Sequence, residues 1–158
     1  MPLDTAAFRA SLSRFASGVT VLTTRSADGR DLGMTATAFS SLSLDPPLVL
    51  VCIDRTASIA PALEGLTHLA VHVLGADQEA ISRQFALKDG DRFAGLAVTR
   101  GAGGVPLVPG ALVRLECRIA ERHAGGDHVI VVAEVLAAEV GEGEPLLYFR
   151  GRYARLAP

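Results

Sequence analysis

The chain reads Gly33-Met34-Thr35-Ala36-Thr37-Ala38-Phe39-Ser40-Ser41-Leu42-Ser43-Leu44-Asp45-Pro46-Pro47 immediately before the apolar run Leu48 to Ile53. The first stretch combines Ser and Thr hydroxyls with small Ala side chains, so its backbone can come close to a flat, polar group. Pro46 and Pro47 lack amide donors, and we expect them to interrupt any strand ladder. The run after them is typical of a strand that is buried on both faces. The hydroxyl-rich stretch is therefore a candidate binding surface between two strands.

The residues before this stretch predict a helix and a β-hairpin. Residues 5 to 17 place Phe8, Leu12 and Phe15 on one helical stripe, which indicates a short amphipathic lid helix that Gly18 ends. Residues 19 to 24 are rich in β-branched side chains, and Asp28-Gly29 is a strong hairpin signal. We expect this hairpin to deliver residues 33 to 39.

The residues after the stretch predict further strands with short helices between them. Helices are expected over residues 58 to 66 and, capped by Asp77, over residues 78 to 86. Strands are expected over residues 69 to 74, 113 to 119, 128 to 138 and 146 to 156, with a polar loop at 87 to 93. This order predicts a mainly β protein, an antiparallel barrel with a few short flanking helices.

Composition bounds the possible functions. At 158 residues, 49% hydrophobic and 20% charged, the chain fits a single folded domain over residues 1–158. Its 15 basic and 17 acidic side chains create no field that would attract nucleic acid. The N-terminus lacks the pattern of a secretion signal, and the longest apolar run is too short to cross a bilayer. We therefore expect a cytoplasmic protein that associates with neither membrane nor nucleic acid.

Several motifs that could carry chemistry are better explained structurally. Gly101 to Gly104 is followed by Pro106, so it predicts a flexible loop and not the helix-opening turn of a dinucleotide fingerprint. His123 and His128 lack the spacing of metal ligands, and no metal site is expected. His72 is expected to be a hydrogen-bonded core or interface residue. The two cysteines, Cys52 and Cys117, are expected to be buried, reduced thiols.

Six motifs occur in the order and register of one known family. They are Gly18-Val-Thr-Val-Leu-Thr-Thr24, Gly33-Met-Thr-Ala-Thr-Ala-Phe-Ser-Ser41, Asp45-Pro-Pro-Leu48, Lys88 through Arg92-Phe93, Gly126-Asp-His128 and Tyr148-Phe-Arg-Gly-Arg-Tyr153. Together they resemble the NAD(P)H:flavin oxidoreductases of two-component monooxygenase systems. The resemblance covers nearly the whole chain and implies an FMN-binding split β-barrel.

The resemblance implies a site for FMN or FAD. The ring edge is expected beside Met34, Thr35, Ala36 and Thr37, and the phosphate side beside Ser40 and Ser41. Lys88 and Arg92 can neutralise the phosphate through charge-assisted hydrogen bonds. Weaker candidates for the cofactor site are Cys52 and Ser58. His128 is expected on the nicotinamide side, with Tyr153 as its companion.

The implied activity is reduction of flavin by NADH or NADPH in a homodimer. Neither His128 nor Tyr153 need act as an acid or base, because hydride passes directly between the two cofactors. Reduced flavin would go to a partner monooxygenase or halogenase. One alternative is a flavoprotein without catalytic activity, serving storage or sensing. Another is an oxidase that acts on a small organic substrate, as pyridoxine-phosphate oxidases do.

Overall fold

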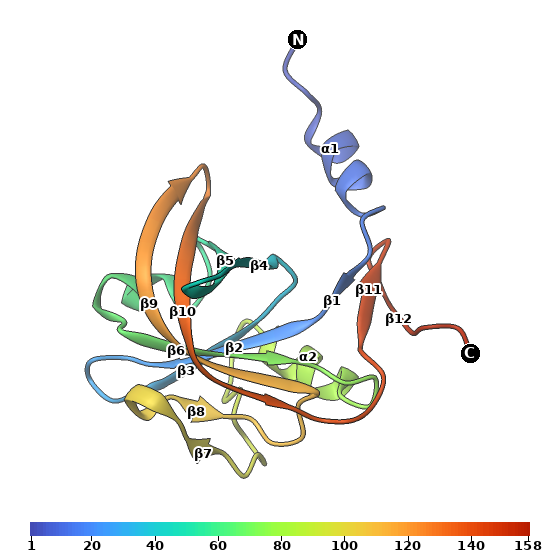
Figure 1. Cartoon of the computed structure of the whole chain (residues 1–158). Helices are drawn as coiled ribbons and strands as arrows, with labels where there is room; N and C mark the ends of the chain where they lie inside the picture. Colours follow the sequence, from blue (N-terminus) through green and yellow to red (C-terminus); the bar gives the residue numbers. More distant parts are fainter.

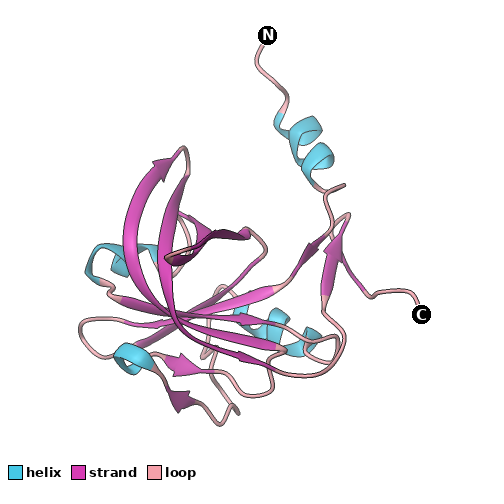
Figure 2. Cartoon of the chain, viewed as in Figure 1, coloured by secondary structure: helices cyan, strands magenta, loops and turns pink.

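The computed structural model describes residues 1–158 as a mainly antiparallel β protein with two short α-helices, and this fold class is as predicted (Figures 1 and 2). The helices are α1 (Thr5–Leu12) and α2 (Glu79–Phe85), and 3₁₀ turns cover Ala60–Gly65 and Ala102–Gly104. The strands are β1 (Ser17–Gly18), β2 (Thr20–Arg25), β3 (Asp31–Ala36), β4 (Phe39–Leu44), β5 (Pro47–Asp54), β6 (His68–Val73), β7 (Thr99–Arg100), β8 (Pro106–Leu107), β9 (Val113–Gly125), β10 (His128–Val140), β11 (Leu147–Phe149) and β12 (Arg152–Ala154).

The main sheet has seven strands in the order β3-β2-β6-β9-β10-β5-β4. Its two edge strands, β3 and β4, follow each other in the chain and are joined by Thr37 and Ala38 alone. A link of two residues spans at most about 11 Å from Cα to Cα. The sheet must therefore curl until its edges nearly meet, which makes it a split barrel. The hydroxyl-rich stretch forms both edges of the split.

The strands around Pro46 and Pro47 correct two expectations. The ladder is not interrupted: Asp45 and Pro46 form a tight turn, and Pro47 opens β5 in register with Leu44. The first residue of a strand is a position that tolerates proline. Strand β5 is also not buried on both faces, because burial alternates along it, with Val49, Val51 and Ile53 buried and the residues between them half-buried. One face of β5 thus remains available to line a site.

Two hydrophobic clusters hold the fold together. The larger cluster lies inside the curled sheet, where Leu22, Val51 and Val131 pack against the 3₁₀ turn that carries Leu63. The smaller cluster forms between the sheet and α2, around the fully buried ring of Phe85. Helix α2 begins after Gln78 and not after Asp77 as expected, and no side chain caps it.

Strand β3 and α2 pack unusually closely at Gly33. A Cβ added there would lie 2.6 Å from the Phe85 ring, so only glycine fits without displacement. This contact fixes the edge strand of the sheet against α2.

Helix α1 ends at Leu12 and not near residue 17, and it buries no residue. The Asp4 carboxylate accepts from the Ala7 amide and caps the start of the helix. The Ser13 hydroxyl donates to the Ala10 carbonyl near the end of the helix, a local bond that competes with helix continuation. The helix points away from the sheet (Figure 2), so it is not a lid over its own chain.

His72 and the two cysteines were predicted to have structural roles, and the structure shows where each of them lies. His72 is fully buried: its Nδ1 donates to the Val21 carbonyl at 3.1 Å and its Nε2 accepts from the Val108 amide at 3.0 Å. Burial lowers the pKa of His72 to about 4, which keeps the ring neutral. Both cysteines are free thiols. Burial raises the pKa of Cys117 to about 12, but Cys52 is only half-buried, on the open face of β5.

Other expectations change in detail. The glycine-rich segment predicted as a loop forms a 3₁₀ turn between β7 and β8. There the Ala102 amide donates to a Glu116 carboxylate oxygen at 2.7 Å. The closing segment 146 to 156 is a hairpin of β11 and β12, and β11 also pairs with β1.

Candidate functional site

The link between the two edge strands offers unpaired backbone donors. Thr37 and Ala38 are exposed, and the amide of neither residue donates a hydrogen bond within the chain. Their carbonyls are engaged, since the Thr37 carbonyl accepts from Phe39 at 3.0 Å and the Ala38 carbonyl accepts from Cys52 at 2.9 Å. The link is therefore held in place while its two N–H groups remain free for a ligand.

A mostly apolar groove of about 420 Å³ lies beside this link. The open face of β5 forms one wall, and the end of α1 with the segment after it forms another. The lining residues are Leu12, Phe15, Ser17, Thr37, Ala38, Phe39, Ser40, Leu50 and Cys52. The Ser40 hydroxyl donates to the Ser41 carbonyl at 2.8 Å, and Ser41 is exposed outside the groove. The groove thus gathers three predicted residues, Thr37, Ser40 and Cys52.

A second cleft, of about 220 Å³, contains two cationic side chains and two carboxylates. Ser58, Lys88 and Arg92 meet there, although they are far apart in the sequence, and Gly33 of β3 forms part of the wall. Asp31 and Asp91 also line the cleft, and Asp31 is paired with Arg100 at 2.6 Å. The cleft therefore brings together the predicted phosphate-binding cations and Ser58.

Most donors of Arg92 are already used within the chain. Its Nη1 donates to the Gly33 carbonyl at 2.8 Å and to the Ser58 hydroxyl, and its Nε donates to the Leu87 carbonyl at 2.9 Å. Its Nη2 also donates to the Leu87 carbonyl, which leaves one of the five N–H groups free. Arg92 thus ties the loop after α2 to β3, while Lys88, the only lysine of the chain, carries the uncommitted charge.

Three other predicted residues turn their side chains away from both cavities. Met34 and Ala36 pack with the large core cluster inside the sheet. The Thr35 hydroxyl donates to the Ser82 carbonyl of α2 at 2.6 Å. These side chains are therefore engaged elsewhere, and the part of the three residues that can contact a ligand is the backbone. An edge strand leaves every second backbone N–H group unpaired.

Tyr153 of β12 contacts α2. Its hydroxyl is 2.7 Å from the Ser82 hydroxyl, and the Arg83 guanidinium lies over its ring, 4.8 Å from the centroid. The buried Ser82 therefore contacts both Tyr153 and Thr35. Nothing in the sequence indicated this connection, because a single serine within a helix carries no pattern.

His128 lies at the start of β10 opposite Asp54 of β5, with its Nδ1 2.7 Å from an Asp127 carboxylate oxygen. The Thr56 amide and hydroxyl, each 2.7 Å from Asp54 Oδ1, lower the pKa of Asp54, and His128 adds to the effect. The tip of the β9–β10 hairpin and strand β12 lie on opposite sides of the molecule (Figure 1). One chain therefore does not bring His128 and Tyr153 together.

Phe39 and Leu50 line the groove but were not predicted as site residues. The run from Leu48 to Ile53 is apolar at every position, so the sequence offers no signal that separates its groove face from its core face.

The cavities fit a flavin nucleotide. The groove offers an apolar slot with free amides at its rim, which suits a flat ring with a polar edge. Lys88 in the second cleft suits a phosphate, and Gly33 in the cleft lies four residues before Thr37 in the groove, about 13 Å along an extended strand. No group of three or more His, Cys, Asp or Glu side chains is placed to hold a metal. None of the helices has the length and apolar character needed to span a membrane.

Comparison with known proteins identifies the family. The sequence profile of the flavin reductase like domain matches residues 12–157. The chain belongs to this family. It is 44% identical, over 95% of its own length and 85% of the relative's, to the FMN reductase (NADH) SmoA of Agrobacterium fabrum. It is 46% identical to the reductase component of the 4-hydroxyphenylacetate 3-monooxygenase of Thermus thermophilus, over 95% of each chain.

A solved flavin reductase has nearly the same fold. The structure is the NADH:FAD oxidoreductase SgcE6 of Streptomyces globisporus in complex with NAD and FAD fragments. It superposes with a TM-score of 0.92 at 39% identity, covering 98% of this chain and 94% of that chain. The family resemblance predicted from the motifs is therefore confirmed, and so is the split-barrel fold.

Proposed function

We propose that this chain is a flavin reductase that transfers hydride from NADH or NADPH to FMN or FAD. The observation that carries the proposal is the pair of free amides at Thr37 and Ala38, which line an apolar groove and follow the strand whose Gly33 lines the cleft with Lys88. The proposal is also supported by the membership of the chain in the flavin reductase like domain family. The non-catalytic alternative has no comparable support.

The residues of the chain have binding and orienting roles. A bound flavin supplies the hydride acceptor, and the reduced nicotinamide supplies the donor. The free Thr37 and Ala38 amides would donate to the polar edge of a bound flavin ring and would stabilise negative charge there. Phe39, Leu50 and Cys52 exclude water from one ring face. Lys88 binds the phosphate, with Ser58 and the remaining N–H of Arg92 beside it. No residue needs to hold or release a proton during hydride transfer.

We assign His128, with Tyr153, to the nicotinamide side. Since one chain holds these residues apart, the site is completed by a second copy in a homodimer. Support comes from Leu12 and Phe15, which are 58% and 82% exposed although they line the apolar groove. Light scattering of the purified protein tests this assignment: a mass near 33 kDa, twice the 16.5 kDa of the chain, supports it and a monomer contradicts it.

We further propose that the flavin is a substrate that is handed to a monooxygenase or halogenase. Both cavities are open to solvent, as an exchanging flavin requires. The free thiols of Cys52 and Cys117 fit the reducing cytoplasm, where we place the activity. Neither nucleic acid nor membrane enters this function.

The decisive experiment measures oxidation of NADH and of NADPH by the pure protein with riboflavin, FMN or FAD. Flavin-dependent oxidation with micromolar Michaelis constants supports the proposal. Purified protein that retains flavin but does not oxidise either nicotinamide would favour the storage alternative and refute a reductase.

A further inference from the structure

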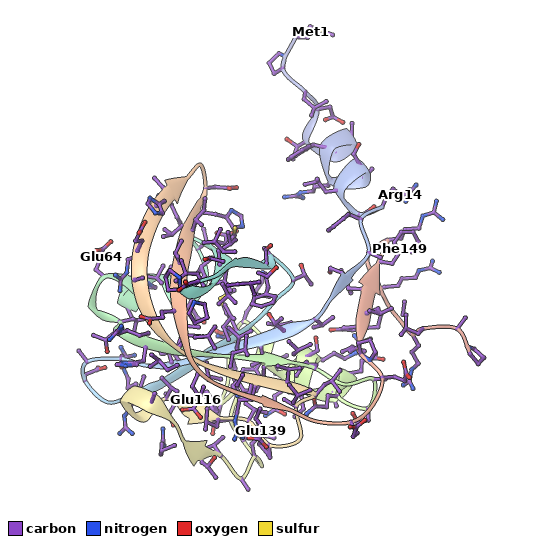
Figure 3. All side chains as sticks on the ribbon, viewed as in Figure 1. Met1, Arg14, Glu64, Glu116, Glu139 and Phe149 are labelled. Atoms are coloured by element: carbon purple, nitrogen blue, oxygen red, sulfur yellow. The ribbon has the colours of Figure 1, made fainter.

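The loop after α2 carries Lys88 at its tip, and the tip is held only through its two ends. The amides of Lys88, Asp89 and Gly90 donate no backbone hydrogen bond, and all three residues are exposed. Helix α2 itself is fixed, because side chains fill the space between the helix and the sheet (Figure 3). The place of Lys88 in the cleft therefore depends on the contacts that hold the two ends of this loop tip.

One of these contacts is made by the Arg92 side chain. Its guanidinium donates to the carbonyl of Leu87, the residue before Lys88, and to the Gly33 carbonyl of β3. The loop is thereby joined to the sheet. An arginine side chain is long and flexible, so its guanidinium can keep both acceptors while its own backbone moves. The Arg92 side chain alone does not fix the loop tip.

The other contact is made by Gln84 in the last turn of α2. Its Nε2 donates to the Arg92 carbonyl at 2.8 Å and to the Ala94 carbonyl at 2.9 Å, so both N–H groups of the amide are used. The same segment packs on the helix through Phe93, whose ring lies edge-on to the Phe85 ring at 5.0 Å. Gln84 thus fixes the backbone from which the Arg92 guanidinium extends.

Gln84 makes these contacts without belonging to either cavity. It carries no charge, and it lines neither the groove nor the cleft. Replacing it therefore changes how the loop is held and leaves every cation of the cleft in the chain. Replacing Lys88 or Arg92 cannot separate these two effects, because each of those changes also removes a charge.

We propose that Gln84 is a positioning residue for the flavin phosphate, acting through Arg92 on Lys88. The proposal rests on the proposed reductase function and deepens it, because Gln84 would set the preference for a phosphorylated flavin over riboflavin. Without the Gln84 amide, the loop tip samples more positions, and Lys88 must be ordered each time a phosphate binds. Phosphate binding weakens as a result, while the contacts of the flavin ring with Thr37 and Ala38 stay the same.

Gln84→Met and a matched control test the proposal. Methionine keeps the length and the helix propensity of glutamine but has no N–H group to donate. The control is Gln78→Met. Gln78 is the other glutamine of the chain and precedes α2, and its Nε2 likewise donates to a distant carbonyl, that of Pro109, at 3.2 Å. Gln78 lines neither cavity, so this control loses a similar contact away from the loop tip.

Quenching of flavin fluorescence measures the affinities for FMN and riboflavin without turnover. At about 20 mM salt we expect the dissociation constant of Gln84→Met to rise about fivefold for FMN and to stay within about twofold for riboflavin. At about 0.5 M salt the FMN effect should fall below about twofold, because the charge of Lys88 is screened. Gln78→Met should bind both flavins as the wild type does, even where its melting temperature is lower.

A double-variant cycle separates positioning from a general loss of structure. In the Lys88→Ala background, Gln84→Met should change the dissociation constant for FMN by less than about twofold, because the charge that Gln84 positions is already absent. Melting temperatures establish that the variants are folded. Gln84→Ala, which also lacks the amide and favours a helix, replaces Gln84→Met if that variant does not fold.

Equal weakening of FMN and riboflavin binding overturns the proposal, since Gln84 would then support the fold and not the phosphate site. The same conclusion follows if neither Gln84 variant folds, or if the FMN effect persists in Lys88→Ala or at high salt. The proposal also fails if Gln84→Met binds FMN as the wild type does, or if the wild type binds no FMN. Wild-type protein that binds FMN but oxidises neither NADH nor NADPH refutes the reductase function separately, because the titrations need no turnover.

Discussion

Replacing Lys88 with alanine tests the phosphate cleft directly. Lys88 is exposed and has no partner in the chain, whereas Arg92 beside it spends four of its five N–H groups on Gly33, Ser58 and Leu87. Two unit charges 4 Å apart attract by about 1 kcal/mol in water, and a phosphate monoester carries nearly two charges at neutral pH. The loss is therefore about 2 kcal/mol, or roughly thirtyfold in affinity.

The assay compares Michaelis constants for FMN and riboflavin in wild type and Lys88→Ala. At about 20 mM salt we expect the constant for FMN to rise ten- to thirtyfold and the constant for riboflavin, which has no phosphate, to stay within twofold. At about 0.5 M salt the FMN effect should shrink to a few-fold, because the charges are exposed and screened. Lys88→Arg, which keeps the charge, should restore most of the affinity.

Equal increases for riboflavin and FMN would refute this reasoning, since they would show that Lys88 shapes the loop and does not bind phosphate. An FMN effect that does not change with salt would also contradict an electrostatic contact.

Three further predictions follow from other contacts. Arg92→Ala should raise the Michaelis constant for riboflavin as well as that for FMN, because it releases the loop from Gly33. The constant for FMN should rise more, because a charge beside the phosphate is also lost. Gly33→Ala should lower the free energy of unfolding by about 1–3 kcal/mol in urea denaturation, because its Cβ would lie 2.6 Å from the Phe85 ring. Between pH 7.5 and 5, the free energy of unfolding should fall by about 2 kcal/mol more in the wild type than in His72→Gln. The folded pKa of His72 is about 4, below the ordinary 6.5, so the unfolded chain gains a proton first and stability is lost as pH falls. An equal pH dependence in both proteins would contradict the buried, neutral histidine.

Local patterns predicted the strands well. The Asp28-Gly29 turn joins β2 and β3 as expected, and the alternation over residues 113 to 119 lies within β9. These features depend on near neighbours in the chain, whose preferences the sequence shows directly. Errors arose where a distant segment decided the outcome. The open face of β5 depends on which distant segments leave it uncovered.

The assigned site residues remain predictions, but the structure separates them into groups. Thr37, Ser40 and Cys52 line the groove, and Ser58, Lys88 and Arg92 line the cleft. The motif resemblance predicted all six residues. Residue spacing alone could not show that Lys88 is free whereas Arg92 is bound to Gly33, Ser58 and Leu87. That distinction depends on the carbonyls of Gly33 and Leu87, which become neighbours only when α2 packs against β3.

The sequence by itself determined the mainly β architecture, the hairpins and the family, because strand periodicity and turn residues act over short distances along the chain. The tertiary structure alone decided that the edges of the sheet meet at Thr37 and Ala38 with two unpaired amides. It also decided that Gln84 and Arg92 hold the loop of Lys88 against α2 and β3. Both features arise because curling the sheet and packing α2 against β3 bring together residues whose proximity no local pattern encodes.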